Sequence, residues 1–264
     1  MTRRCLMIRM TIAALAAALA PAGPGAAVAQ PAPLVAAASD LQFALEEIAA
    51  AFTRDTNTEV RLVFGSSGNF ARQIGRGAPF EIFLSADESF VHGLAERGLT
   101  RDDGVLYAVG RIVLFAPTGG PLAGDLSAQG LRDALASGRL ARFAIANPEH
   151  APYGRAAEQW LRRNDLWDAV QPALILGENA SQAAQFASSG AADGGIIPYS
   201  LALAPRVGER GSSVLLAAEQ HEPLRQRMVL LENAGAVAER FYDYMQQPAA
   251  RQIMRRYGFT LPEE

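Results

Sequence analysis

The sequence predicts an α/β fold in two compact lobes that are joined through strands. Short apolar runs of strand character alternate with stretches of helical spacing in both halves of the chain. Between residues 34 and 97 the order is strand, helix, strand, helix, strand, helix, which is typical of a parallel, doubly wound sheet. No internal segment has the composition of a flexible linker, so two lobes in close contact are favoured over domains on a tether.

The first 29 residues are typical of an export signal. Three arginines precede an apolar run over 10–20, which is shorter than the roughly 20 residues that a bilayer span needs. Small residues then end at Ala29, and we predict that residues 1–29 are a signal peptide cleaved after Ala29. The alternative is an N-terminal membrane anchor. Cleavage would leave 235 residues in the periplasm and would remove Cys5, which precedes the apolar run and so is not placed as a lipoprotein cysteine.

The composition excludes several kinds of chemistry. All 24 basic residues are arginine, so a Schiff-base lysine or a P-loop lysine cannot occur. The one cysteine lies in the leader, which excludes a disulfide or a thiolate metal site, and three histidines argue against a histidine-rich metal site. Without the three arginines of the leader, the chain has 21 arginines and 27 acidic residues. The resulting net charge of −6 argues against nucleic-acid binding.

The expected elements follow one another with few interruptions. In the first half the predicted strands cover 34–38, 60–64 and 80–84, and the predicted helices cover 41–52, a stretch through 71–74, and 88–97. In the second half a strand over 111–116 precedes an α/β set from about residue 129 to 217, a late strand over 227–231, and helices over 236–245 and 248–256.

Serines follow two successive predicted strands of the first half. Ser39 comes after the first strand, Ser66 and Ser67 come after the second, and both turns open a helix. Ligands of open α/β sheets bind beyond the carboxyl ends of the strands, where unpaired N–H groups and the helix dipole favour an anion. A second interpretation is that these serines only cap their helices.

Two turns of the second half are placed to face these serines across a cleft between lobes. Residues 147–154 follow a strand over 143–146, and residues 177–181 follow a strand over 173–176. We interpret His150, in the first turn, as a structural hydrogen-bonding residue rather than a metal ligand.

Several blocks of the sequence are similar to a known family. These blocks are residues 36–39, 65–67, 71–74, 77–79, 83–87, 147–154, 241–244 and 256–259. In this order they cover nearly the whole chain after the leader, and they resemble the periplasmic molybdate-binding proteins of ABC importers.

This resemblance implies a two-lobed type II periplasmic binding protein fold that closes about a hinge. Lobe 1 would comprise residues 30–109 with 222–264, and lobe 2 residues 110–221. The resemblance further implies that a monomer binds molybdate or tungstate through neutral donors, without a cofactor or a bare metal ion, and docks on a membrane permease. The implied ligand residues are the side chains of Ser39, Ser67 and Tyr199 and the backbone N–H groups of Tyr153 and Ala180.

Two positions depart from the family pattern. Where some members place a ligand tyrosine, this chain has Pro198 followed by Tyr199, so Tyr199 either substitutes or the contact is lost. Asp40 stands directly after Ser39, where many members carry an apolar residue. We expect its carboxylate to point to solvent, since it would repel an oxyanion and an acidic residue is favourable in the first turn of a helix. The alternative is that Asp40 adapts the site to a protonated or metal-associated ligand.

Other functions remain open alternatives. Within the same class the ligand could be sulfate or phosphate. An exported hydrolase that uses Ser67 is disfavoured, because residues 65–69 lack the glycine spacing of a nucleophile elbow and no motif places a base nearby. His221 and Glu222 lack the second histidine of a zinc protease. The export signal argues against the effector-sensing domain of a regulator.

Overall fold

The computed structural model describes residues 32–262, in which the strands form two five-stranded sheets. The first sheet, with the order β2-β1-β3-β10-β4, defines lobe 1, and the second, with the order β7-β6-β8-β5-β9, defines lobe 2. The strands of lobe 1 are β1 (Leu34–Ala38), β2 (Arg61–Gly65), β3 (Ile82–Ser85), β4 (Val105–Gly110) and β10 (Leu224–Leu230). The strands of lobe 2 are β5 (Ile112–Pro117), β6 (Phe143–Ala146), β7 (Leu174–Gly177), β8 (Gly194–Pro198) and β9 (Gly211–Leu215).

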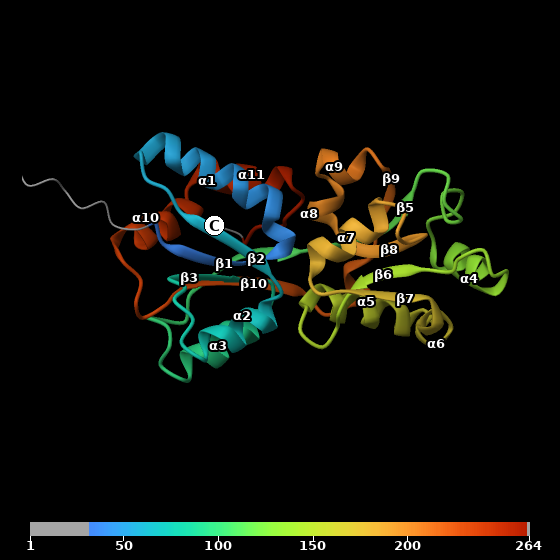
Figure 1. Ribbon diagram of the computed structural model, residues 1–264, viewed down its shortest axis with the longest axis horizontal. Coiled ribbons are helices and arrows are strands. Elements are labelled where there is room, and N and C mark those ends of the chain that lie inside the picture. The colour runs from blue at the N-terminus through green and yellow to red at the C-terminus, as the bar shows by residue number, and fades with distance from the viewer. Residues whose placement is uncertain (1–31, 263–264) are drawn as a thin grey trace, which may run out of the picture. The chain divides into compact units, whose positions relative to one another are not determined.

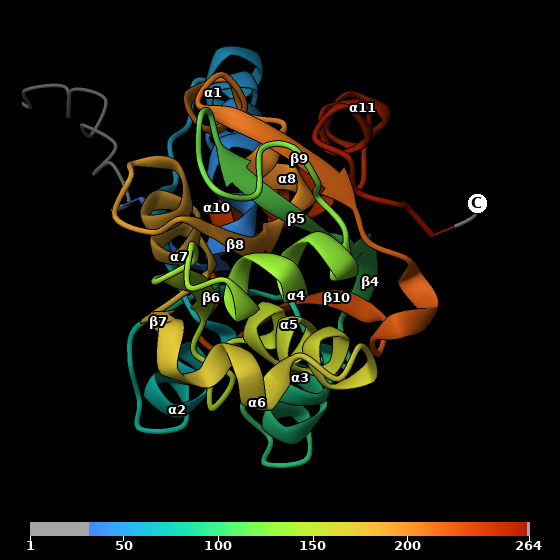
Figure 2. The same cartoon turned by 90° about the vertical axis from the view of Figure 1, so that its right-hand side faces the viewer.

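Helices cover both faces of each sheet (Figures 1 and 2). Lobe 1 carries α1 (Gln42–Thr56), α2 (Ser67–Ile74), α3 (Glu88–Ala95), α10 (Ala236–Met245), α11 (Pro248–Arg256) and the short 3-10 helix η1 (Ser39–Leu41). Lobe 2 carries α4 (Ala128–Ala136), α5 (Pro152–Arg163), α6 (Trp167–Val170), α7 (Ala180–Ser188), α8 (Tyr199–Ala202), α9 (Pro205–Gly208), η2 (Gln171–Ala173) and η3 (Ala218–Gln220). Figures 1 and 2 place α7 and α8 on one face of the second sheet and α5 and α6 on the other.

The alternation of side chains along β1 explains why lobe 1 has two cores. Val35 and Ala37 pack with buried residues of α1 and α10, whereas Ala36 packs with buried residues of α2 and α3. Successive residues of a strand point to opposite faces, so a strand that is apolar throughout must be covered on both sides. The near-continuous apolar run over 34–38 is the sequence signal of this arrangement.

The sheets are mixed: the parallel arrangement predicted for the first three strands is confirmed, and antiparallel strands join it in the same sheet. In lobe 1, β1 pairs in parallel with β2 and β3, as predicted, but β10 is antiparallel to both β3 and β4. In lobe 2, β6 is parallel to β7 and β8, and β5 is antiparallel to β8 and β9. The antiparallel pairs involve the four strands at the crossings between the lobes, since the chain leaves lobe 1 from β4 to β5 and returns from β9 to β10.

The chain passes from the first sheet to the second between Gly110 and Ile112 and returns between Leu215 and Leu224. The predicted lobe boundaries near 109 and 222 lie close to these crossings. As statements about hinge motion they stay predictions.

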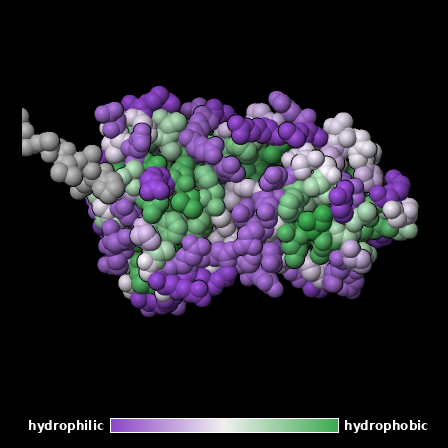
Figure 3. Space-filling model, in the orientation of Figure 1, coloured by the Kyte–Doolittle hydropathy of each residue, from purple (hydrophilic) through white to green (hydrophobic). Residues whose placement is uncertain are grey.

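The predicted signal peptide and its cleavage after Ala29 lie outside the described residues. Within residues 32–262 no helix combines the length and the apolar character that a bilayer crossing would require. On the face seen in Figure 3, hydrophilic side chains cover much of the surface, including the zone where the lobes meet.

Candidate functional site

Four of the five predicted ligand residues line one small cavity where the lobes meet. The cavity has a volume of about 10 Å³, which is room for about one water molecule. Lobe 1 contributes the residues that follow β1 and β2, and lobe 2 contributes the first turns of α5 and α7. Its lining residues are Ala38, Ser39, Asp40, Gly65, Ser66, Ser67, Ala86, Ala151, Pro152, Tyr153 and Ala180. No arginine is among them.

The two predicted serines are buried, and backbone N–H groups hold their hydroxyl oxygens in place. The N–H of Ser181 donates to Ser39 Oγ at 3.1 Å, and the N–H of Ala86 donates to Ser67 Oγ at 2.9 Å. Since each oxygen already accepts a hydrogen bond, the hydroxyl proton is available for an acceptor in the cavity. Neither serine caps a helix, because Ala38 and Leu41 precede η1 and α1, and Ser66 precedes α2. The interpretation of Ser39 and Ser67 as helix caps is therefore wrong.

Lobe 2 presents the beginnings of two helices to the same cavity. Tyr153 is the second residue of α5, after Pro152, and Ala180 is the first residue of α7. N–H groups in the first turn have no partner within the helix and lie at the positive end of its dipole. A Cβ added to Gly154 would lie 2.2 Å from the carbonyl oxygen of Ala146, so glycine lets α5 begin directly against the end of β6.

The structure does not bring Tyr199, the fifth predicted ligand residue, to this cavity. Tyr199 opens α8, and its N–H donates to the carbonyl of Arg111 at 2.9 Å. Its ring lies against Gly258, where an added Cβ would come within 2.6 Å of it. Pro198, which occupies the matching strand end, closes β8.

Asp40 is buried, and the expectation that it points to solvent is wrong. Its side chain is 1% exposed, and its Oδ2 accepts hydrogen bonds from the Tyr153 hydroxyl at 3.0 Å and from Gln226 Nε2 at 2.7 Å. Ser200 Oγ also donates to the Asp40 carbonyl at 2.8 Å. Burial raises the pKa of Asp40 from 3.8 to about 7, although the bonds from Gln226 and Tyr153 lower it. The sequence signal was misleading because the first turn here is a 3-10 turn that aims the carboxyl inward.

Two residues that the sequence did not mark complete a polar network around Asp40. Gln226 Oε1 accepts a hydrogen bond from the Tyr107 hydroxyl at 2.7 Å, and both side chains are buried. Burial raises the pKa of Tyr107 and of Tyr153 well above the usual value of 10, so both hydroxyls stay protonated donors. A Cβ on Gly110 would lie 2.2 Å from the Tyr153 hydroxyl oxygen, so this crossing point must be glycine for the network to fit.

Further contacts join the lobes around the cavity. His150 Nδ1 lies 3.0 Å from Ser66 Oγ, and the Gly68 N–H donates to the His150 carbonyl at 3.0 Å. His150 thus has the structural hydrogen-bonding role that we predicted. Arg155 of α5 forms an ion pair with Asp87, which precedes α3. In the described part of the chain, no cluster of three or more His, Cys, Asp or Glu side chains could hold a metal ion.

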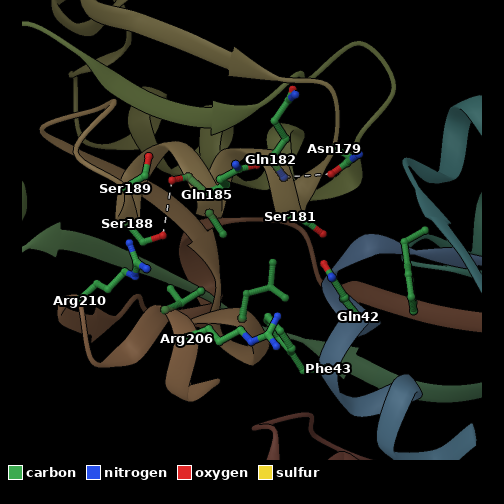
Figure 4. Close-up of a pocket in the computed structure, with 14 residues that line it drawn as sticks. Gln42, Phe43, Asn179, Ser181, Gln182, Gln185, Ser188, Ser189, Arg206 and Arg210 are labelled. Atoms are coloured by element: carbon green, nitrogen blue, oxygen red, sulfur yellow. Dashed lines mark hydrogen bonds between the residues drawn. The ribbon is translucent and has the colours of Figure 1, made fainter.

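A larger cavity of about 660 Å³ lies beside the small one, between α7 and the segment that carries α8 and α9 (Figure 4). Figure 4 shows Ser181, Gln182 and Gln185 on one side and Arg206 on the other. Ser181, which lines the larger cavity, donates its N–H to Ser39 Oγ, and Ser39 lines the small cavity. The larger cavity contains none of the five predicted ligand residues, so the small cavity is the candidate oxyanion site.

The fold and the site define a solute-binding protein. The model of the bacterial extracellular solute-binding protein family matches residues 33–260, and the chain belongs to this family. The molybdate-binding protein ModA of Rhodobacter capsulatus is 34% identical over 230 residues, which are 86% of this chain and 87% of that protein. The molybdate-binding protein ModA of Azotobacter vinelandii is also 34% identical over 230 residues, 86% of this chain and 89% of that protein.

A solved structure supports the same assignment. The periplasmic molybdate-binding protein of Azotobacter vinelandii superposes with a TM-score of 0.79 at 31% identity, covering 88% of this chain and all of that chain. The two-lobed periplasmic binding protein fold and the resemblance to molybdate-binding proteins are therefore confirmed. All three of these relatives are named as molybdate-binding proteins.

Proposed function

We propose that this chain is a periplasmic binding protein that captures molybdate or tungstate and delivers it to the membrane permease of an ABC importer. The observation that carries this proposal is the set of neutral donors from both lobes around one cavity. The hydroxyls of Ser39 and Ser67 converge there with the first turns of α5 and α7, and no arginine lines the cavity. The names of the relatives support the choice of anion.

A tetrahedral dianion suits such a site because hydrogen bonds can replace its hydration shell without a counter-charge. Each hydrogen bond to a charged group contributes roughly 1.5–3 kcal/mol net. Donors that are fixed in position select an anion of matching size that is fully deprotonated. Closure of the lobes excludes water and so strengthens the hydrogen bonds from these donors to the anion. Hinge closure is part of the proposal, and the contacts of Ser66 with His150 and of Asp87 with Arg155 are compatible with a closed state.

The proposal also covers export, oligomeric state and the absence of catalysis. The protein is exported after cleavage at Ala29, acts as a monomer, and uses no cofactor. It catalyses no reaction: Ser67 Oγ accepts a bond from the Ala86 N–H, an arrangement that supports a hydrogen-bond donor rather than a nucleophile activated by a base. Tyr199 would contact the anion only after a rearrangement of α8.

Calorimetry on the protein without residues 1–29 tests this function. Molybdate, tungstate, sulfate and phosphate are titrated separately at micromolar protein concentration. We expect heat and a one-to-one stoichiometry with molybdate or tungstate. Binding of sulfate or phosphate in preference to both heavy oxyanions would establish the alternative ligand class. No heat with any of the four anions would overturn the proposal.

A further inference from the structure

The carboxyl group of Asp40 is not explained by the binding of an anion through neutral donors alone. It lines the small cavity beside Ser39, it is 1% exposed, and a carboxylate there would face a dianion. Within the described residues its two oxygens differ: Oδ2 accepts two hydrogen bonds, whereas Oδ1 is buried with no hydrogen-bond partner. A buried polar atom left unpaired costs free energy, so this oxygen needs either a proton or a ligand to explain it.

The surroundings of Asp40 fit the neutral acid better than the carboxylate. The groups that face it are the hydroxyls of Tyr107 on β4 and Tyr153 on α5, the amide of Gln226 on β10, its own backbone N–H, and the Ser200 hydroxyl on α8 at its backbone carbonyl. These are uncharged donors, and no basic side chain is among them. In the acid form, Oδ2 is the carbonyl oxygen that accepts from Tyr153 and Gln226, and Oδ1 carries the proton.

We propose that Asp40 binds the oxyanion as a neutral carboxylic acid whose Oδ1–H donates a hydrogen bond to an oxygen of the anion. Capture of the dianion by a molecule in which Asp40 is ionised therefore takes up one proton from solvent, and release returns it. This inference rests on the proposed function and deepens it: Asp40 makes oxyanion binding proton-linked.

Burial sets the pH range in which this coupling acts. With a pKa of about 7 in the structure, Asp40 is divided between its two forms near neutral pH. A dianion beside it raises the pKa further, because two like charges in a buried site repel. Binding is therefore full below pH 7 and weakens as the pH rises, approaching tenfold per pH unit. We expect an affinity about 25-fold lower at pH 8.5 than at pH 6.5.

The test is calorimetry of the protein with molybdate at these two pH values, in two buffers that differ in ionisation enthalpy. The difference in heat between the buffers counts the protons taken up. We expect nearly one proton per anion at pH 8.5 and few at pH 6.5. The anion itself is fully deprotonated over this range, so the uptake belongs to the protein.

Asp40→Asn is the matched variant, because its amide reproduces the acid form. Its Oδ1 accepts from Tyr153 and Gln226, and its Nδ2 donates into the cavity without a titrating proton. We expect Asp40→Asn to bind with an affinity that is independent of pH and, at pH 8.5, well above that of the unmodified protein.

The outcomes separate this inference from the proposed function. Molybdate binding by the unmodified protein with no proton uptake at pH 8.5 would overturn the role of Asp40 and leave the function intact. Proton uptake that persists in Asp40→Asn would also overturn it, because the protons would then be taken up by another group. Absence of binding by both proteins at both pH values would overturn the proposed function and, with it, this inference.

Discussion

The two lobes furnish their parts of the cavity by different chemical means. Lobe 1 presents side-chain hydroxyls at the ends of β1 and β2, and lobe 2 presents the backbone N–H groups that begin α5 and α7. A hydroxyl can be deleted by one substitution, whereas a backbone donor survives nearly every substitution. Changes of side chain in lobe 1 should therefore alter affinity strongly, and in lobe 2 only a change to proline removes a donor.

The largest expected effect is the loss of the lobe 1 hydroxyls. Ser39→Ala and Ser67→Ala should each weaken molybdate binding by about ten- to a hundredfold, and together by about a thousandfold, since each removes a hydrogen bond to a charged group. Calorimetry measures the affinities, and thermal unfolding checks that the variants fold, because each leaves a backbone N–H of Ser181 or Ala86 without its acceptor.

Ser188→Ala is the matched control, since Ser188 lies in the larger cavity. Its affinity should equal that of the unmodified protein. If Ser188→Ala weakened binding and the other two variants did not, the anion site would lie in the larger cavity.

The next effect concerns how the stability of the ligand-free protein depends on pH. It arises from Asp40 of lobe 1, whose carboxyl accepts a hydrogen bond from the Tyr153 hydroxyl of lobe 2. Folding raises the pKa of Asp40 from 3.8 to about 7, so between these values the folded state binds more protons than the unfolded state. Stability from this group is therefore lost as the pH rises. We expect the free energy of unfolding to fall, relative to Asp40→Asn, by about 2.5 kcal/mol between pH 5 and pH 7.5.

Urea unfolding of both proteins at the two pH values measures this difference. The comparison with Asp40→Asn cancels the titration of other groups. Parallel pH dependence in the two proteins would mean that Asp40 is ionised in the folded state with its ordinary pKa.

The sequence identified the lobe 1 hydroxyls but not the network behind them, for a physical reason. Ser39 and Ser67 follow apolar runs of strand character, so their place at strand ends is a local property. The bond between Asp40 and Gln226 joins residues 186 positions apart, and the predicted last strand began at 227, one residue after Gln226. Local spacing contains no information about this contact.

The elements show the same division between local and distant signals. Helices α10 and α11 begin and end where periodicity predicted, at 236–245 and 248–256. Strands β4 and β9 were not predicted as separate strands, and β9 is mostly exposed, so it lacks the apolar pattern that marks a buried strand. Tyr199 was assigned from a motif alone, and the motif does not record that its ring packs against Gly258.

A smaller effect is expected when a backbone donor of lobe 2 is removed. Ala180→Pro deletes the N–H at the first position of α7, where proline is well tolerated, and Asn179 before it is already extended. The next two N–H groups of the turn, those of Ser181 and Gln182, already donate to Ser39 Oγ and Asn179 Oδ1, so the loss is that of one hydrogen bond to the anion. We expect binding to weaken by about tenfold with the fold intact. Calorimetry and circular dichroism measure the two properties.

Ala180→Gly retains the N–H and is the control for the side chain. It should bind within about twofold of the unmodified protein. Equal affinities of Ala180→Pro and Ala180→Gly would show that α7 offers no donor to the anion, and the proposed contrast between lobes would lose one of its two helices.

The smallest effect is expected from the ion pair that spans the lobes. Arg155 and Asp87 are partly exposed, and such pairs contribute only about 0.2–1 kcal/mol. Arg155 also lies 5.5 Å from the centre of the Phe90 ring of α3, so it contacts lobe 1 twice. Arg155→Gln should favour the open form slightly, weakening binding by up to about fivefold, mainly through faster release of the anion, which stopped-flow dilution measures.

Arg162→Gln is the matched control for this last prediction. Arg162 lies on the same helix but pairs with Glu158 within lobe 2, so its loss leaves the contact between lobes unchanged. Because both substitutions remove one exposed arginine, they change the net charge equally and share any long-range effect on an approaching anion. A difference between them isolates the interlobe contact, whereas equal release rates would show that lobe closure does not depend on the contacts of Arg155.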